Sequence, residues 1–214
     1  DITFPVFCHV IGLGIHGTDT QVEIHPTDPA ATCIFGPNTE NSQGTHLANL
    51  WMELPVDNAA IIEARELNSC IIEDCVFRPG GGADVIGIRT AVAAGGAKRP
   101  EIRRCSFESG DVDLAYAMYF QGTMLQNARI HDNDIIAKAG IYIAALTPAD
   151  QTVIKRNVVI ATEGIGIDDN NGRSRVIDND VYSPTDAIEH GGGPAFTIRN
   201  RIQEAAGAGA WETG

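Results

Sequence analysis

Basic residues are few in this chain of 214 residues, which has 15 lysines and arginines against 28 aspartates and glutamates and a formal net charge of −13. A nucleic-acid partner requires a basic face that neutralises phosphates, so this balance argues against DNA, RNA and anionic lipid surfaces. It leaves room for an acidic sugar polymer held by a local basic patch. No apolar run approaches the length of a membrane-spanning helix, so no such span is expected.

Cysteines and the common cofactor motifs are also scarce. The five cysteines include no C-x-x-C pair and no Cys/His spacing typical of zinc, so neither a zinc site nor a disulfide framework is expected. No G-x-S-x-G or phosphate-binding loop occurs, and the glycines of residues 12–17 precede no helical pattern, which excludes a dinucleotide fingerprint. A helical period of 3.6 is equally hard to find, because the best candidate, 59–67, also alternates like a strand.

The chain does contain one repeated phrase: an apolar residue, two variable residues, Asn, one further residue and an apolar residue. One of its four occurrences has Thr in the first position, and the asparagines are separated by 24, 22 and 21 residues. Two earlier repeats have Cys in the Asn slot, and a third is a looser match. The slot residues are Asn133, Asn157, Asn179 and Asn200, with Cys75, Cys105 and the looser match Asn49 before them.

Short period-two strands and turns rich in Gly, Asn and Pro lie between these repeats. Such units predict coils that stack strand on strand at about 4.8 Å. An inward Asn at a constant slot would bond to its neighbours along the stack. We therefore predict an all-β fold, a single-stranded parallel β-helix (solenoid) of about seven to eight coils with an Asn/Cys ladder. Cys75 and Cys105 would act as small apolar fillers, with a disulfide between them as the alternative.

The predicted solenoid occupies residues 1–214 as one domain. Its early coils, over 1–44, are irregular, the regular coils cover 45–203, and 204–214 form a tail. Neither end carries the pattern of a capping helix, although solenoids need their ends covered. The chain also begins at Asp1 instead of Met. We therefore expect a mature form or a piece of a longer chain, with a partner chain or flanking sequence over the open end.

The slot residues and their phrase resemble the right-handed parallel β-helix of the pectin-lyase-like superfamily, and residues 10–18 (VIGLGIHGT) are similar to its early coils. The resemblance covers roughly residues 5–203. It implies a protein that handles a polysaccharide lying along a parallel sheet, as a hydrolase, lyase or epimerase. The alternatives are a homotrimeric phage tailspike or cell-surface protein that binds glycan without cleaving it, and a purely structural solenoid. The first two imply an extracellular or virion-associated location.

Registered coils predict outward columns of side chains, in which a sugar could bind. Counting from the ladder places in one column Gly87, Tyr119, Tyr142, Gly166 and Glu189. The neighbouring column then holds Arg89, Gln121, Ala144, Asp168 and Gly191. Aromatic platforms beside polar and acidic groups suit a carbohydrate, although tyrosines are common in strands without any such function. The predicted substrate-binding residues are Tyr119, Tyr142, Arg89, Gln121, Asp169 and His190.

Asp168 and Glu189 form the candidate catalytic pair. In the predicted register they lie one coil and two positions apart, roughly 8 Å between backbones. Inverting glycosidases hold two carboxylates about 6.5–9.5 Å apart, one as general acid and the other as base. The alternative is an ordinary turn, because Asp168 opens the segment D-D-N-N-G.

Two activities of the superfamily can be compared with the sequence directly. Polygalacturonases carry an Asp-Asp pair and, about one coil later, Gly-His-Gly. Asp168-Asp169 and Glu189-His190-Gly191 match this only in part, and the N-T-D and R-I-K motifs are absent, so this activity is not expected. Pectate lyases use calcium-binding carboxylates. We predict no required metal, with a Ca²⁺ site as the alternative; its candidate ligands are Asp111, Asp113, Asp132, Asp134, Asp178 and Asp180.

Overall fold

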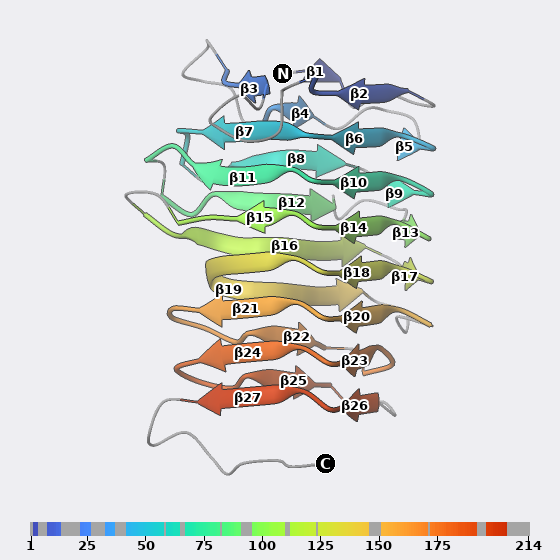
Figure 1. The fold of residues 1–214 in the computed structure, drawn as a ribbon, viewed down its shortest axis with the longest axis vertical. Helices are drawn as coiled ribbons and strands as arrows, with labels where there is room; N and C mark the ends of the chain where they lie inside the picture. Colours follow the sequence, from blue (N-terminus) through green and yellow to red (C-terminus); the bar gives the residue numbers. More distant parts are fainter. Residues whose placement is uncertain are drawn as a thin grey trace.

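The fold is a solenoid of short parallel strands whose coils stack along one axis (Figure 1). The computed structural model describes residues 2–3, 8–13, 22–26, 33–36, 42–57, 59–64, 67–81, 83–90, 96–109, 112–122, 124–145, 151–170, 172–191 and 196–204. Every regular element within these ranges is a strand. The segment 59–67, which was the best helix candidate, contains strand β8 (Ala60–Ala64). The predicted all-β parallel solenoid is confirmed.

Each regular coil contributes a strand to each of three faces, which we number in chain order. The first face is formed by β2 (His9–Ile11), β6 (His46–Ala48), β10 (Ile71–Glu73), β14 (Glu101–Arg103), β18 (Arg129–His131), β20 (Val153–Lys155), β23 (Arg175–Ile177) and β26 (Phe196–Ile198). The second face is formed by β3 (Val22–Ile24), β7 (Leu50–Leu54), β11 (Val76–Pro79), β15 (Ser106–Phe107), the first part of β19 (Asp134–Ala145), β21 (Val158–Ala161), β24 (Asp180–Ser183) and β27 (Arg201–Glu204).

The third face carries the candidate site. It is formed by β1 (Ile2–Thr3), β4 (Phe35–Gly36), β8, β12 (Ile86–Thr90), β16 (Leu114–Gly122), the later part of β19, β22 (Ile167–Asp169) and β25 (Ile188–His190). Strand β19 bends from the second face onto the third, since it pairs with β21 and then with β22. Two short pairs complete the coils: β5 (Ser42–Gln43) with β9 (Leu67–Asn68), and β13 (Gly96–Lys98) with β17 (Met124–Gln126).

The core consists of apolar columns that run along the stack. Because strand residues alternate between faces, every second side chain points inward, as in the pattern of β7. The first-face column contains aliphatic residues that are at most 1% exposed, and burying each stabilises the fold by about 1.5–3 kcal/mol. Its members on consecutive strands are Ile72, Ile102, Ile130, Ile154 and Val176. On the second face, Phe77 stacks on Phe107 with ring centroids 4.6 Å apart.

The predicted Asn ladder is confirmed. The side-chain Nδ2 of each Asn donates to Oδ1 of the next, and all three steps, from Asn133 through Asn157 and Asn179 to Asn200, measure 2.9 Å. Each Nδ2 also donates to a main-chain oxygen of the preceding coil, such as that of Ile130. The first three asparagines are buried, so the ladder satisfies amides that would otherwise be unpaired in the core.

The two cysteines continue this column, and Asn49 does not. Cys75 and Cys105 are buried and carry free thiols, so no disulfide joins them. Burial, with Cys75 close by, raises the pKa of the Cys105 thiol. The pairing of β6 with β10 places Leu50, one residue after Asn49, opposite Cys75. The prediction of Asn49 as a slot residue was therefore wrong by one position.

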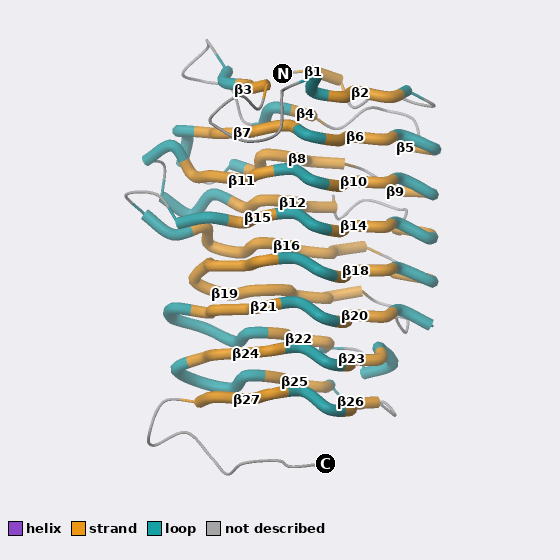
Figure 2. The backbone as a smooth tube through the Cα atoms, in the orientation of Figure 1, coloured by secondary structure: helices purple, strands orange, loops and turns teal. Residues whose placement is uncertain are grey.

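Asn49 belongs instead to a column of residues with a left-handed backbone conformation, at the turn from the first face to the second. We call it the left-handed column. Its residues have φ between 50° and 58°; they are Asn49, Asp74, Arg104, Asp132, Arg156, Asp178 and Arg199. Figure 2 shows these turns as loop segments that lie one above another. This backbone conformation is unfavourable for most residues, and the short Asn and Asp side chains tolerate it best.

Charges alternate along six members of this left-handed column. Arg104 bonds to both carboxylate oxygens of Asp74, at 2.8 Å each. In the same way, Nε and Nη2 of Arg156 donate to the two carboxylate oxygens of Asp132, and Nε and Nη2 of Arg199 donate to those of Asp178. These four distances are 2.6–2.8 Å. The pairs are exposed, so each contributes modestly to stability, but each joins a coil to its neighbour.

The corner where the chain enters the third face requires small residues. Two consecutive residues point inward there, for example Ala117 and Met118. The first of the two is small in five consecutive coils, which have Gly87, Ala117, Gly140, Gly166 and Ala187 at this position. Neighbouring main chains come too close for anything larger.

We expect Gly140→Ala to destabilise the fold by about 1–3 kcal/mol through overpacking. A Cβ at Gly140 would lie 2.2 Å from the carbonyl oxygen of Gly166 and 2.6 Å from Cγ1 of Val159. Gly164→Ala is the matched control, because its nearest contact would be the Ala139 side chain at 3.3 Å. Urea unfolding of the two variants measures the difference. Equal stability of the two would show that the corner is not tightly packed.

Candidate functional site

One outward column on the third face collects most of the predicted site residues. Strand pairing places Arg89 opposite Tyr119, Tyr119 opposite Tyr142, and Tyr142 opposite Asp168. Asp168 in turn lies opposite Glu189. The column therefore runs from a cation through two aromatic rings to two carboxylates on five consecutive strands.

The predicted register was wrong by two residues on two of these strands. It placed Gly87 and Gly166 in the tyrosine column, whereas Arg89 and Asp168 occupy those positions. Both segments repeat Ile and Gly in alternation, and a shift of two residues keeps every side chain on its own face. The apolar pattern therefore cannot distinguish the two registers. The predicted pairing of Gln121 with Ala144 is confirmed.

Three tyrosines cluster at the centre of this surface, two of them in the column. The rings of Tyr119 and Tyr142 stack, with centroids 4.9 Å apart and planes 10° from parallel. Tyr116 leans against both, at 4.8 Å and 5.7 Å. Burial, followed by charge on the neighbouring tyrosine hydroxyls, raises the pKa of the Tyr116 and Tyr119 hydroxyls. The hydroxyl of Tyr142 accepts a bond of 3.3 Å from Asn170 Nδ2.

Sequence reasoning missed Tyr116. Strict alternation would point it and Tyr119, three residues later, to opposite faces. The corner at Ala117 and Met118 adds one inward residue, so both tyrosines emerge on the same side. The signal that could have found it is the small residue at the corner, which recurs in five consecutive coils.

Arg89 and Gln121 lie at two edges of this surface. Arg89 is on the strand before that of Tyr119, and Gln121 is two residues after Tyr119 on the same strand. The Arg89 guanidinium donates to Glu63 Oε2 at 2.7 Å, and Glu63 is its strand partner one coil earlier. This ion pair fixes Arg89 at the end of the tyrosine cluster. Gln121 is half-buried, and its main chain exchanges two hydrogen bonds with the Thr90 hydroxyl, at 2.6 Å and 2.9 Å.

Asp168 and Glu189 are direct neighbours on adjacent strands. Their backbones are thus separated by one strand spacing, about 4.8 Å, and not by the predicted 8 Å. Desolvation by burial, followed by the charges of Glu189 and Asp169, raises the pKa of the Asp168 carboxyl to about 6. At mildly acidic pH, Asp168 can therefore hold a proton while facing the outer surface.

Asp169 and His190 lie behind this surface, in an inward column with Ile143. Asp169 is fully buried, and its Oδ2 accepts a bond of 2.8 Å from the Ser174 amide. His190 Nδ1 lies 3.8 Å from the same oxygen, and His190 Nε2 is 2.8 Å from the Thr197 hydroxyl. Burial would raise the pKa of Asp169, but the imidazole and the Ser174 amide outweigh it and lower that pKa. Asp169 is therefore out of reach of a ligand on the outer surface.

The carboxylates considered for calcium are mostly engaged elsewhere. Asp132 and Asp178 are held by arginines, as described above, and Asp113 accepts a bond of 2.6 Å from the Thr162 hydroxyl. Asp180 lies 3.6 Å from Arg201, Asp134 is exposed on the second face, and Asp111 falls outside the described residues. The described part of the chain does bring together Glu23, His25 and Glu53, whose ligand atoms lie within 4.8 Å of one another in an exposed position.

Comparison with known proteins agrees with this architecture. No curated protein and no solved structure gives a significant match to the chain. In the parts that the structure describes, no helix is long and apolar enough to cross a membrane. The family described as right-handed beta helix region matches residues 55–209, which is most of the chain. The match includes the whole outward column from Arg89 to Glu189. The chain therefore belongs to the family of right-handed β-helix proteins.

Proposed function

We propose that this protein binds a polysaccharide along the third face and cleaves a glycosidic bond there. One observation carries the proposal: Tyr119, Tyr142, Asp168 and Glu189 stand in one outward column on consecutive strands. Aromatic rings and a carboxyl group that can hold a proton are thereby placed along a line, which is the shape of a sugar chain.

The tyrosines supply the binding surface. Aromatic rings offer large apolar area with a polar hydroxyl at the edge, and both match a pyranose ring, which has apolar faces and hydroxyl edges. The stack of Tyr119 on Tyr142 is parallel to within 10°, so it presents one continuous edge along the column. A sugar next to it would meet Asp168 on the following strand.

Asp168 is the proposed general acid. Its raised pKa keeps it protonated at mildly acidic pH, so it can donate that proton to the leaving glycosidic oxygen as the bond breaks. Glu189, the exposed neighbour, is the proposed nucleophile at the anomeric carbon. Water then attacks the glycosyl–enzyme bond, Asp168 removes a proton from that water, and Glu189 is released.

The corrected register changes the expected stereochemistry. Retaining glycosidases hold their carboxyl groups about 5–5.5 Å apart, whereas inverting enzymes need about 6.5–9.5 Å to admit a water. Adjacent strands hold the backbones of Asp168 and Glu189 about 4.8 Å apart, which favours the closer, retaining arrangement over the wider, inverting one. We therefore propose retention of configuration, in place of the inversion that the sequence alone suggested.

The test is incubation of the chain with a panel of neutral and acidic polysaccharides. We expect new reducing ends without the ultraviolet absorbance of an unsaturated sugar, and proton NMR of the first product should show the anomeric configuration of the substrate. An inverted first product would contradict Glu189 as nucleophile. Both signals together would indicate a lyase, binding without either would indicate a glycan-binding spike, and no binding at all would favour a structural solenoid.

A further inference from the structure

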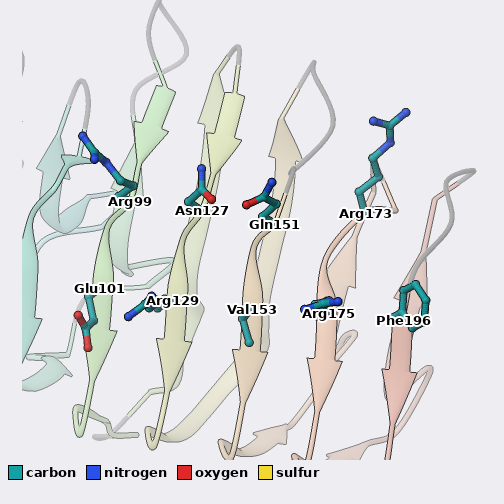
Figure 3. Close-up of a pocket in the computed structure, with 9 residues that line it drawn as sticks. All are labelled: Arg99, Glu101, Asn127, Arg129, Gln151, Val153, Arg173, Arg175 and Phe196. Carbon is teal, nitrogen blue, oxygen red and sulfur yellow. The ribbon is translucent and has the colours of Figure 1, made fainter.

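A second candidate site lies on the first face, away from the tyrosine column. It is a groove of about 900 Å³ that runs across five coils (Figure 3). Its lining residues form two rows, one on the turns and one on the strands. The turn row is Arg99, Asn127, Gln151 and Arg173, and the strand row is Glu101, Arg129, Val153, Arg175 and Phe196. We refer to it as the arginine groove.

Alternation explains why both rows face outward. In each coil the residue between the two rows is buried, and these residues are Pro100, Ala128, Thr152 and Ser174. Residues on either side of them must therefore point to solvent. Arg99, Asn127 and Gln151 also have φ between 52° and 59°, which places them at a left-handed turn.

The arginine groove concentrates positive charge on a protein whose net charge is −13. Four of its nine lining residues are arginines and one is acidic. That acid, Glu101, is already neutralised from outside the groove, because its Oε1 lies 2.7 Å from Arg103 and 3.1 Å from His131. Within the described residues, no ion pair engages Arg99, Arg129 or Arg175.

The spacing of the charges suits a linear ligand. Arg129 and Arg175 are two strands apart, about 10 Å, and Arg99 and Arg173 are three coils apart, about 14 Å. The amides of Asn127 and Gln151 lie between the latter two and can both donate and accept hydrogen bonds. Phe196 is 57% exposed at the C-terminal end of the groove, with the Arg175 guanidinium 6.0 Å from its ring centroid.

We propose that the arginine groove binds a segment of an acidic polysaccharide. Arginines grip carboxylate or sulfate groups with paired bonds, amides match hydroxyls, and an exposed ring stacks on a sugar. A nucleic acid fits less well, because the chain as a whole repels a dense polyanion and the groove offers one aromatic ring instead of a series. This inference is independent of cleavage on the third face.

Binding measurements on the full chain test the proposal. Titration calorimetry would compare polygalacturonate, which carries carboxylates, heparin, which carries sulfates, and dextran, which is neutral. The variant is Arg129→Gln with Arg175→Gln. We expect it to bind at least one of the two acidic probes about 100-fold more weakly, at roughly tenfold per lost charged contact, and to bind dextran as the parent does. The probe that loses affinity identifies the acidic group.

The matched control is Arg78→Gln with Arg201→Gln, which removes the same charge from the second face. Its affinity for the acidic probes should stay within about threefold of the parent. Arg129→Lys with Arg175→Lys retains charge and should recover part of the binding. Unchanged binding in the groove variant, equal loss in the control, or tighter binding to single-stranded DNA than to either glycan would overturn the assignment. Release of reducing ends, which tests the third face, is measured separately.

Discussion

Asp168→Asn is expected to abolish glycan cleavage and, at neutral pH, to make the fold more stable. A positioned general acid accounts for about 10²–10⁴-fold in rate, and an amide cannot donate the proton. The parent activity should also fall as the pH rises through about 6, where Asp168 loses its proton. Reducing-end assays across the pH range measure both effects.

The stability gain follows from the same raised pKa. An ordinary Asp titrates near 3.8, so between that pH and about 6 the folded chain binds the Asp168 proton more tightly than the unfolded chain. Stability therefore declines as pH rises through this interval, and the full cost is present above about 6. Removing the charge should raise the free energy of unfolding by on the order of 1 kcal/mol at pH 7, after allowance for solvent screening. This corresponds to a rise of about 2–4 °C in Tm. Below pH 3.8 no gain is expected.

Asp134→Asn is the control for this variant. It removes one negative charge from an exposed position on the second face, so it tests whether net charge alone explains the result. It should keep full activity and show no comparable pH-dependent gain in Tm. An Asp168→Asn protein that still cleaves glycan would move the acid role to another residue. A gain in Tm that is the same at pH 3.5 and pH 7 would contradict the raised pKa.

Asn157→Ala should cause a large loss of stability. Asn157 Oδ1 accepts bonds from both the amide and the side chain of Asn133, at 3.1 Å and 2.9 Å. Its Nδ2 donates to Ile130 and Asn179. Alanine would remove the bond that Asn157 accepts from the Asn133 amide and one bond each from Asn133 Nδ2, the Ile130 oxygen and Asn179 Oδ1. Each buried group left unpaired costs about 1–3 kcal/mol, and the lost side chain opens a cavity. We expect a loss of at least about 3 kcal/mol in urea unfolding.

Asn200→Ala provides the comparison. Asn200 ends the described ladder and is half-buried, so water can replace part of what it supplies. Its loss should be less than half that of Asn157→Ala. If the two variants unfold alike, the ladder stabilises by filling space, and its hydrogen bonds add little.

The sequence predicted the fold well because the device that builds it is local and repeated. Each Asn of the phrase forms hydrogen bonds with the Asn of the neighbouring coil. An Asn that recurs at the same position of each repeat therefore predicts stacked coils, whatever the rest of the chain does. Asn49 misled because a left-handed turn also favours Asn, one position before the slot. Residue type alone does not separate these two reasons for an Asn.

The site was harder to predict because its geometry depends on register between coils. A slip of two residues preserves the apolar alternation, so Asp168 was placed beside the tyrosine column instead of in it. Tyr116 was missed because the corner at Ala117 breaks the alternation. The arginine groove had a readable signal: its rows lie one and three residues before the first apolar residue of each phrase. Counting backward from the ladder would have found Arg129 and Arg175.

The alternating charges of the left-handed column restrict how this solenoid can lengthen or shorten in evolution. Asp74–Arg104, Asp132–Arg156 and Asp178–Arg199 each join two coils, so the repeating electrostatic unit is a pair of coils. Deleting the single coil of Asp132 would stack Arg104 on Arg156, and like charges directly opposite each other are destabilising. Deleting two coils would restore the alternation. A change in length by two coils should therefore cost this solenoid less stability than a change by one.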